Sequence, residues 1–262
     1  QVDAESRPRG RSQGDDRLLS QELTLLSVVI PCCNERRNVE QFKTELYLIL
    51  EGLGVPFEVL AVDDGSTDGT RQALGSLAAQ RPLRVLVHES NRGLGAALRT
   101  GFAAASGEWI ATLDADLTFH PRHLAALLAK QRETEADLVA GSPFLRAKSA
   151  AEVSWARRLP SLMLNAFYRG LFSRAFTAYT PMFRLYRRAA LMELNLKSEG
   201  FEISAEIAAR FIQRGLRVAE VPVPLMRRRE GASKFDRWRE LRRHAALILR
   251  LLKPLDRLAR SP

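Results

Sequence analysis

The sequence contains few cysteines and no long apolar run. Cys32 and Cys33 are the only cysteines among 262 residues, and because they are adjacent they provide no disulfide framework. Such usage is typical of a reducing compartment, so we expect a cytoplasmic protein. No apolar run approaches the roughly 20 residues of a membrane-spanning helix. Residues 1–22 lack the apolar core of a signal peptide, and their composition predicts a disordered tail.

Histidines and aromatic residues are not arranged as a zinc site or a nucleic-acid surface would need. The four histidines have no spacing typical of zinc ligands, and we expect them at the surface; they are His88, His120, His123 and His244. The basic C-terminal region contains only two aromatic residues, Phe235 and Trp238. Since proteins that bind single strands stack bases on clustered aromatic side chains, we expect no nucleic-acid partner.

Positive charge is present in excess and is concentrated in two segments. The net charge is +10. Residues 142–190 contain 9 Lys/Arg and 1 Asp/Glu, and residues 227–262 contain 12 Lys/Arg and 4 Asp/Glu. An uneven distribution of this kind indicates an anionic partner, such as a phosphorylated ligand or a lipid headgroup.

Short apolar strands alternate with helices in the first part of the chain. The strands are expected within 26–31, 57–70, 83–89, 108–116 and 137–143, and the helices within 34–54, 70–80, 91–107 and 121–136. This alternation predicts an α/β fold with an open, mostly parallel sheet and helices on both faces.

The second part of the chain is basic and richer in helix. Residues 177–188 are expected to form a strand and a loop, and residues 219–235 an edge strand with Pro222 and Pro224 that leads into a basic loop. Residues 236–258 predict a basic amphipathic helix that Pro254 kinks or ends. One stripe of this helix is apolar: Leu241, Ala245, Ile248, Leu249 and Leu252.

Polar segments follow four of the predicted strands and should meet at one edge of the sheet. They are residues 31–35, 63–64, 91–93 and 114–116. Converging carboxylates repel one another unless a cation or a hydrogen-bond donor offsets them. Asp114 and Asp116 are two residues apart at a strand end, so they point the same way and suit Mg²⁺ or Mn²⁺ bound together with a diphosphate.

Each of these segments also has a simpler interpretation. The sequence DDGSTDGT, residues 63–70, is compatible with a turn and a helix N-cap. The glycine-rich segment 91–101 could hold a phosphate, but it lacks the complete pattern of a Walker or Rossmann loop. Asp-x-Asp is common by chance, so the order of the four segments is more informative than any one of them.

Taken in order, the motifs resemble those of the family 2 glycosyltransferases, which have the Rossmann-like GT-A fold. The motifs are PCCNE, VDDGSTDGT, NRGLGAA and DADL. The later segments TPMFRLYRR, GFEISAEIAARFIQRG and EVPVPLMRRREGASKF resemble the dolichyl- or polyprenyl-phosphate mannose synthases within that family. The resemblance covers residues 25–236.

The resemblance implies a site for a nucleotide diphosphate sugar, with Asp116 as the principal metal ligand and Asp114 and Thr118 beside it. Asp116, Arg228 and Lys234 are the implied catalytic residues. The residues implied to bind the nucleotide sugar are Pro31, Cys33, Glu35, Val62, Asp64, Leu113, Asp114, Ala115, Asp116, Arg157, Arg228 and Lys234.

Three motifs depart from the pattern of the family. Thr118 stands where a glutamine often helps to hold the metal, and Pro143 replaces the arginine of a Gly-Ser-Arg motif, for which Arg146 or Lys148 could substitute. Pro181 and Met182 replace Ser-Gly in the Thr-Ser-Gly-Phe-Arg motif. These differences concern the sugar and the acceptor more than the fold or the metal. The acid usually found two residues before that motif is Ala178 here.

The resemblance implies transfer of a hexose, with inversion, onto a lipid monophosphate such as polyprenyl or dolichyl phosphate. Mannose from GDP-mannose is the first expectation and glucose from UDP-glucose the second. A phosphate monoester is largely dianionic at neutral pH, so no general base is required. Two alternatives remain: a transferase that uses a hydroxyl acceptor, with Glu202 or Glu206 as base, and a non-catalytic nucleotide-binding module.

A lipid acceptor would require contact with a membrane, and two basic amphipathic segments could provide it. The first, residues 159–176, has an apolar face that could instead pack on the core; its members are Leu159, Leu162, Met163, Ala166, Phe167 and Leu171. The second is the helix within 236–262. We expect a catalytic domain at 23–235 and a peripheral location on the cytosolic face of a membrane, with a small membrane protein as a possible partner.

Overall fold

The computed structural model describes residues 25–145, 155–226 and 237–252, and only the backbone for residues 155–160 and 237. The tail predicted for residues 1–22 and the end of the last helix near Pro254 lie outside this part of the chain. The same holds for Arg146 and Lys148.

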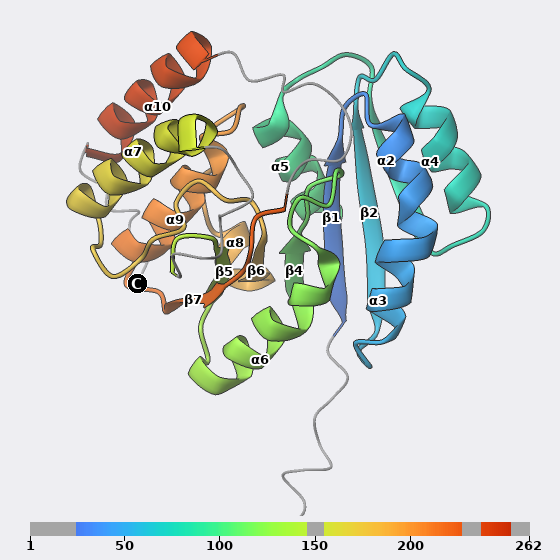
Figure 1. Cartoon of the computed structure of the whole chain (residues 1–262), viewed down its shortest axis with the longest axis horizontal. Helices are drawn as coiled ribbons and strands as arrows, with labels where there is room; N and C mark the ends of the chain where they lie inside the picture. The colour runs from blue at the N-terminus through green and yellow to red at the C-terminus, as the bar shows by residue number, and fades with distance from the viewer. Residues whose placement is uncertain (1–24, 146–154, 227–236, 253–262) are drawn as a thin grey trace, which may run out of the picture.

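A seven-stranded sheet lies at the centre of the described residues (Figure 1). The strand order is β3-β2-β1-β4-β6-β5-β7. The strands are β1 Leu26–Cys32, β2 Phe57–Asp64, β3 Leu83–His88, β4 Trp109–Thr112, β5 Leu138–Ser142, β6 Arg184–Arg187 and β7 Val218–Pro222. Strand β6 is antiparallel to β4 and β5, whereas the other pairs are parallel. The expected open, mostly parallel sheet is therefore confirmed.

Helices cover both faces of the sheet, as the alternating pattern predicts. They are α2 Arg36–Gln41, α3 Tyr47–Glu51, α4 Thr70–Ala78, α5 Leu94–Ala104, α6 Leu124–Thr134, α7 Trp155–Leu171, α8 Arg188–Met192, α9 Ile203–Gln213 and α10 Arg237–Leu252. Helices α2, α3, α4 and α6 contribute to one apolar core. Helices α5, α7, α8, α9 and α10 contribute to the core on the other face. None of the described helices is both long enough and apolar enough to cross a bilayer.

The helix expected at 34–54 is less regular than its sequence pattern indicates. A π-helical turn, Phe42–Leu46, joins α2 to α3. A π-helical turn contains more residues than an α-helical turn, so the residues that follow it are rotated about the helix axis and a different face packs on the sheet. As a result Tyr47 is fully buried, whereas Ile49 from the predicted stripe is only half-buried.

The two strands of the basic region are β6 and β7, and the proline of β7 lies where a sheet tolerates it. The segment expected at 177–188 supplies β6, which is inserted between β4 and β5. Strand β7 is at the edge of the sheet, as predicted, where the missing N–H of Pro222 removes no central ladder bond. Residues before β6 are loop, in agreement with the sequence.

Helices α7 and α10 pack on the domain through faces other than their apolar stripes. Helix α10 buries Glu240, His244, Leu247 and Leu251, whereas Leu241 and Leu249 are exposed. Helix α7 packs on the core, as the alternative interpretation of 159–176 expected, but not through the apolar face named in the sequence, of which Leu162, Met163, Phe167 and Leu171 are exposed. The core side of α7 contains Ser161, Leu164, Asn165, Tyr168 and Phe172.

The glycines at the start of α5 allow the backbone of residues 198–199 to approach the helix very closely. Gly93 has a φ of 92°, and a Cβ at this position would collide with the carbonyl oxygen of Glu199. A Cβ at Gly95 would collide with the carbonyl oxygen of Ser198. The N–H of Gly95 donates to Glu199 O at 2.7 Å. These glycines therefore fix the segment that precedes α9, which explains their presence without a phosphate.

We predict that Gly95→Ala lowers the free energy of unfolding by about 1–3 kcal/mol, because the Ser198 carbonyl must move away. The matched control is Gly75→Ala in α4, where an added Cβ meets nothing within 4 Å. That change should raise the free energy of unfolding by up to about 1 kcal/mol through helix propensity. Urea unfolding measures both values. Equal effects of the two substitutions would contradict the close approach.

Candidate active site

An acidic turn, residues 113–120, follows β4 at the carboxyl end of the sheet. Its side chains alternate in burial: Leu113, Ala115, Leu117 and Phe119 are buried, and Asp114, Asp116, Thr118 and His120 are half-buried. Both carboxylates are thus partly accessible at the carboxyl end of β4. That they point the same way stays a prediction.

The backbone of this turn is strained at Leu117. Its φ is 50°, in the left-handed region that leucine rarely adopts. A hydrogen bond of 3.0 Å from Leu117 N to Asp114 O closes the turn. Strained residues of this kind gather at functional sites, where the surrounding structure holds them in place.

Thr118 orients the Asp116 carboxylate. Its N–H and its hydroxyl both donate to Oδ1 of Asp116, at 3.0 and 2.6 Å. Thr118 occupies the position where the family resemblance leads one to expect glutamine. A role for Thr118 as a direct metal ligand stays a prediction, whereas its hydrogen bonds to Asp116 are present in the structure.

Asp114 and Asp116 fit a divalent cation that also binds a diphosphate. Among the described residues, no three His, Cys, Asp or Glu side chains form a group that could hold a metal. Two carboxylates on one side of a strand end supply hard oxygen ligands, and Mg²⁺ is commonly held by one or two carboxylates together with substrate phosphates.

The start of the basic loop contacts the acidic turn. The N–H of Met226 donates to Thr118 O at 3.0 Å, and that of Val223 donates to Ser142 O at 3.1 Å. Arg228, two residues beyond Met226, lies outside the described residues, as do Lys234 and the side chain of Arg157. The chain thus enters its predicted phosphate-binding segment beside Asp116.

The loops after β1 and β2 are joined by hydrogen bonds between polar side chains and backbone groups. Asn34 accepts from Thr67 N at 2.7 Å and donates its own N–H to Ser66 Oγ at 2.8 Å. The N–H of Glu35 donates to Thr70 Oγ1 at 2.8 Å. The polar residues of DDGSTDGT therefore hold the two loops against each other.

Asp68 in the same loop accepts hydrogen bonds from Thr70 and from the N–H of Arg36. Burial alone would raise the pKa of Asp68, but these hydrogen bonds outweigh it, and the pKa lies below its ordinary value. The carboxylate therefore stays ionised where it supports the start of α4.

The buried carboxylate of Asp64 anchors the loop after β3. Its Oδ1 lies 2.7 Å from His88 Nδ1 and accepts the N–H of Arg92 at 2.9 Å. Its Oδ2 accepts the N–H of Gly93 at 2.9 Å. The neighbouring Asp63 instead pairs with Arg71 at 3.0 Å. Contact between Asp64 and the base or ribose stays a prediction, but its side chain has a clear structural role.

Other residues predicted to bind the nucleotide sugar divide into two groups by burial. Pro31, Cys33 and Glu35 are half-buried, whereas Cys32 is buried and Asn34 is exposed. The side chains of Val62, Leu113 and Ala115 are buried in the cores. These three residues can reach a ligand mainly through backbone atoms.

The two cysteines have different surroundings. Cys32 is buried in the core, and burial raises the pKa of its thiol, which therefore stays neutral. Cys33 is half-buried, and its sulfur accepts a hydrogen bond from Asn91 Nδ2 at 3.1 Å. This contact brings the loop after β1 to the loop after β3, at the predicted nucleoside site.

Arg184 organises the loop on the expected acceptor side. It is completely buried and donates to the carbonyl oxygens of Ser204, Ala178 and Tyr179 at 2.6–2.8 Å. Burial lowers the pKa of Arg184. Asn165 accepts the N–H groups of Tyr179 and Thr180. The loop that contains Ala178, Pro181 and Met182 is therefore held by hydrogen bonds between its backbone and the side chains of Arg184 and Asn165.

Glu202 and Glu206, the alternative bases, are both buried. Glu206 accepts the N–H of Ser198 at 2.8 Å and pairs with Arg210 at 3.0 Å. One carboxylate oxygen of Glu202 accepts the N–H groups of Glu199 and Gly200. In this conformation both carboxylates support the segment before α9.

The expectation that all four histidines lie at the surface is wrong. His88 and His244 are buried. Each has a polar partner in the interior: His88 contacts Asp64, and the Nδ1 of His244 lies 2.9 Å from the Tyr168 hydroxyl. The sequence pattern has no local signal for these pairs, because each joins elements that are distant in the chain.

Comparisons with known proteins agree with the motifs. Residues 27–194 match the protein family described as Glycosyl transferase family 2. The narrower resemblance to dolichyl- or polyprenyl-phosphate mannose synthases stays a prediction.

Two solved structures illustrate the likeness of the fold. One is glucosyl-3-phosphoglycerate synthase from Mycobacterium tuberculosis with Mn²⁺, UDP and phosphoglyceric acid. Its TM-score is 0.65 at 22% identity, over 96% of this chain and 86% of that one. The other is S. aureus TarS with UDP-GlcNAc, with a TM-score of 0.57 at 22% identity, over 86% of this chain and 66% of that one.

We predict that Asp64→Ala lowers the free energy of unfolding by about 3 kcal/mol, because two backbone N–H groups and His88 lose their buried acceptor. Glu89→Ala, an exposed carboxylate in the same loop, is the control and should change stability by at most about 0.5 kcal/mol. Thermal and urea unfolding test both variants. A loss no larger than that of the control would show that Asp64 does not anchor the loop.

Proposed function

Because the chain belongs to glycosyl transferase family 2, we propose that it transfers a hexose from a nucleotide diphosphate sugar to an acceptor that carries a phosphate. The observation that supports this most directly is the acidic turn, in which the half-buried Asp114 and Asp116 lie beside the start of the basic loop.

UDP-glucose is the donor that we propose to test first, and GDP-mannose the second. The support for UDP-glucose is the likeness of fold to a glucosyl-3-phosphoglycerate synthase whose structures contain UDP-glucose and Mn²⁺. The support for GDP-mannose is the resemblance of the segments 180–188, 200–215 and 220–235 to the mannose synthases.

In the proposed reaction an acceptor oxygen forms a bond to C1 of the hexose while the bond from C1 to the diphosphate oxygen breaks, with inversion at C1. Asp114 and Asp116 would hold Mg²⁺ or Mn²⁺, which supplies positive charge to offset the departing diphosphate. Thr118 keeps the Asp116 carboxylate in position. Arg228 and Lys234, in the segment after Met226, would add fixed positive charge.

The acceptor determines whether a base is needed. A phosphate monoester brings an anionic oxygen, so the step transfers no proton. A hydroxyl acceptor must lose its proton to a base. In this conformation Glu206 is engaged by backbone groups and by Arg210, and one oxygen of Glu202 is engaged by the N–H groups of Glu199 and Gly200. This favours a lipid monophosphate as one acceptor to test. Phosphoglycerate, which the similar synthase binds, is the other.

The test measures release of nucleoside diphosphate by the full chain with Mn²⁺, with each donor paired with each acceptor. We expect turnover with one donor, its loss after chelation of the metal, and its recovery when Mn²⁺ is added back. Asp116→Asn should lower kcat/KM by about 100-fold or more, because a charged metal ligand is lost.

Glu108→Gln is the matched control. It removes an exposed carboxylate at the opposite end of β4 and should leave turnover unchanged. Undiminished metal-dependent turnover by Asp116→Asn would contradict the assignment of the acidic turn. Nucleotide-sugar binding without any turnover on the panel would favour the non-catalytic alternative.

A further inference from the structure

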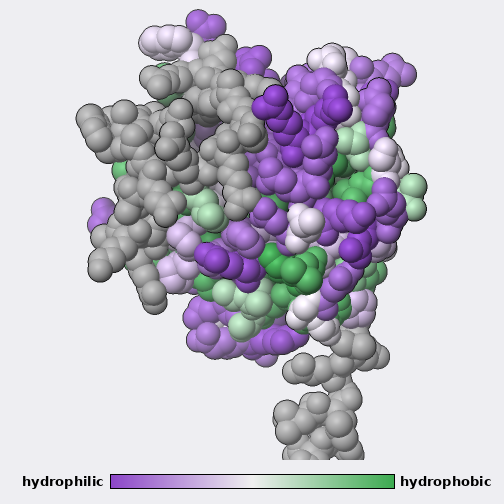
Figure 2. Space-filling view, turned by 45° about the vertical axis from the view of Figure 1, so that its right-hand side comes forward, coloured by the Kyte–Doolittle hydropathy of each residue, from purple (hydrophilic) through white to green (hydrophobic). Residues whose placement is uncertain are grey.

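Exposed apolar side chains are concentrated on two helices. Of the 13 large hydrophobic residues that are exposed among the described residues, eight belong to α7 and α10. We call these eight the α7–α10 face: Leu162, Met163, Phe167, Leu171, Trp238, Leu241, Leu249 and Leu252. The side that carries α2 and α4 is mostly hydrophilic in the space-filling view (Figure 2). Single exposed apolar residues are ordinary, but a contiguous group indicates an interaction surface.

Helix α7 packs on the domain through one side and leaves large apolar side chains exposed on the other. Its packed side is mixed: Leu164, Tyr168 and Phe172 join the apolar core, and Asn165 is buried and bonded to Ser161 and to the 179–180 backbone. Met163 and Phe167, on the opposite side, are 65% and 52% exposed. These exposed side chains do not contribute to the core, which leaves them available to a partner.

Helix α10 is held to the domain by buried polar contacts that leave its apolar stripe outside. Glu240 accepts the N–H of Phe201 at 3.3 Å, and His244 contacts Tyr168 of α7. Trp238 is 75% exposed and Leu249 is 66% exposed. The contact between His244 and Tyr168 also shows that α7 and α10 lie side by side, as Figure 1 shows.

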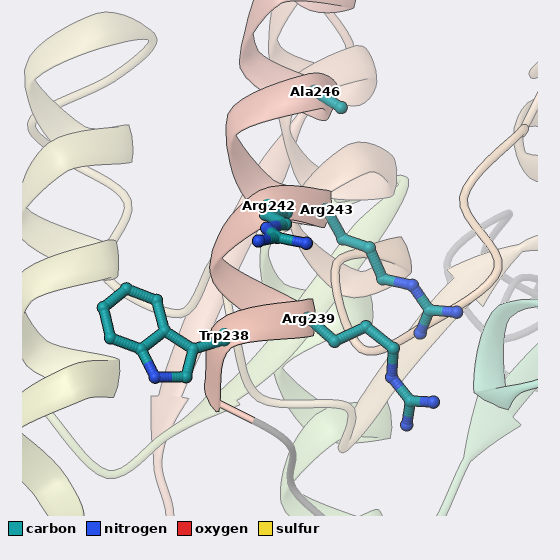
Figure 3. A pocket seen from close by; sticks show the side chains of 5 residues that line it. All are labelled: Trp238, Arg239, Arg242, Arg243 and Ala246. Atoms are coloured by element: carbon teal, nitrogen blue, oxygen red, sulfur yellow. The ribbon is translucent and has the colours of Figure 1, made fainter.

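Arginines border the apolar stripe of α10. Arg239, Arg242 and Arg243 line a hollow of about 800 Å³ together with Trp238 and Ala246. In Figure 3 the side chains of Arg239 and Arg243 extend to the same side of the helix, and Trp238 extends to the other. The exposed surface of α10 therefore consists of an apolar stripe next to a basic one.

Among the described residues of α7 and α10, no acidic side chain is exposed. Helix α7 contains no Asp or Glu over its whole length. The one acidic residue of α10 is Glu240, which is buried. A surface with exposed apolar side chains and arginines complements a lipid layer, whose interior is apolar and whose headgroups can be anionic.

We infer that the α7–α10 face docks on an anionic lipid bilayer. Basic amphipathic helices lie in the membrane interface with their apolar side chains inserted, and each Lys or Arg near an anionic surface adds about 1 kcal/mol. A second copy of the chain fits less well, because a two-fold contact would place the same arginines against one another. The inference does not depend on the proposed transfer reaction.

Docking there would put a membrane close to the candidate active site. In Figure 1, α10 lies at the end of the molecule toward which β1 and β2 run. Strand β4 is parallel to β1, so the acidic turn is at that end as well. A lipid acceptor held in the membrane would then approach the site from the side of α7 and α10.

The test is co-sedimentation of the full chain with vesicles of phosphatidylcholine alone and of phosphatidylcholine with 30% phosphatidylglycerol, a composition chosen to be anionic. We expect binding to the anionic vesicles, and a decrease in affinity of roughly tenfold or more for Phe167→Ser/Leu249→Ser, because inserted apolar area is lost. The substituted side chains are exposed, so the fold should be retained; the unfolding temperature checks this.

Leu48→Ser/Val87→Ser is the matched control, since these side chains are 70% and 46% exposed on α3 and β3. It should bind vesicles as the parent chain does. Absence of binding to anionic vesicles, or an equal loss in both double variants, would overturn the inference. So would a dimer of the parent chain that Phe167→Ser/Leu249→Ser dissociates, because the occupant would then be a second copy. Turnover with a soluble acceptor reports on the proposed reaction separately.

Discussion

The buried carboxylate of Asp64 is the interaction on which the rest of the structure depends. It joins the end of β2 to His88 on β3 and to the backbone that leads into α5. Gly93 and Gly95 then bring α5 against the segment before α9. These contacts connect the loops after β2 and β3, where the nucleoside is predicted to bind, to the segment that precedes α9. A carboxyl group in the interior is tolerated because each of its oxygens has a hydrogen-bond partner.

Charge is separated in space in a way that matches the two proposed roles. Asp114 and Asp116 follow β4 at the carboxyl end of the sheet, where a cation and a diphosphate are proposed to bind. Basic residues occupy α7 and α10, whose exposed surface has no described carboxylate. The hydrogen bond from the N–H of Met226 to Thr118 O places the start of the basic loop beside the acidic turn.

The sheet and the acidic turn could be predicted from local pattern. Strands such as β1 are continuous apolar runs, and Asp114 and Asp116 follow β4 at the carboxyl end of the sheet, where the sequence predicts them. Other features depend on distant contacts that no local pattern contains. Gly95 is required by the Ser198 carbonyl, and His88 is buried by Asp64. The apolar stripe of α7 was visible in the sequence, but whether it faced the core was decided by Asn165 and its partners.

The most direct test of the central claim is the binding of UDP-glucose, measured by calorimetry with and without Mn²⁺. If Asp114 and Asp116 hold a cation that bridges to the diphosphate, affinity should rise at least about tenfold with Mn²⁺, and this rise should disappear in Asp114→Asn/Asp116→Asn. The affinity without metal should change little in that variant, because the nucleoside contacts remain. The account would be contradicted if the parent chain bound UDP-glucose with the same affinity in the presence and in the absence of Mn²⁺.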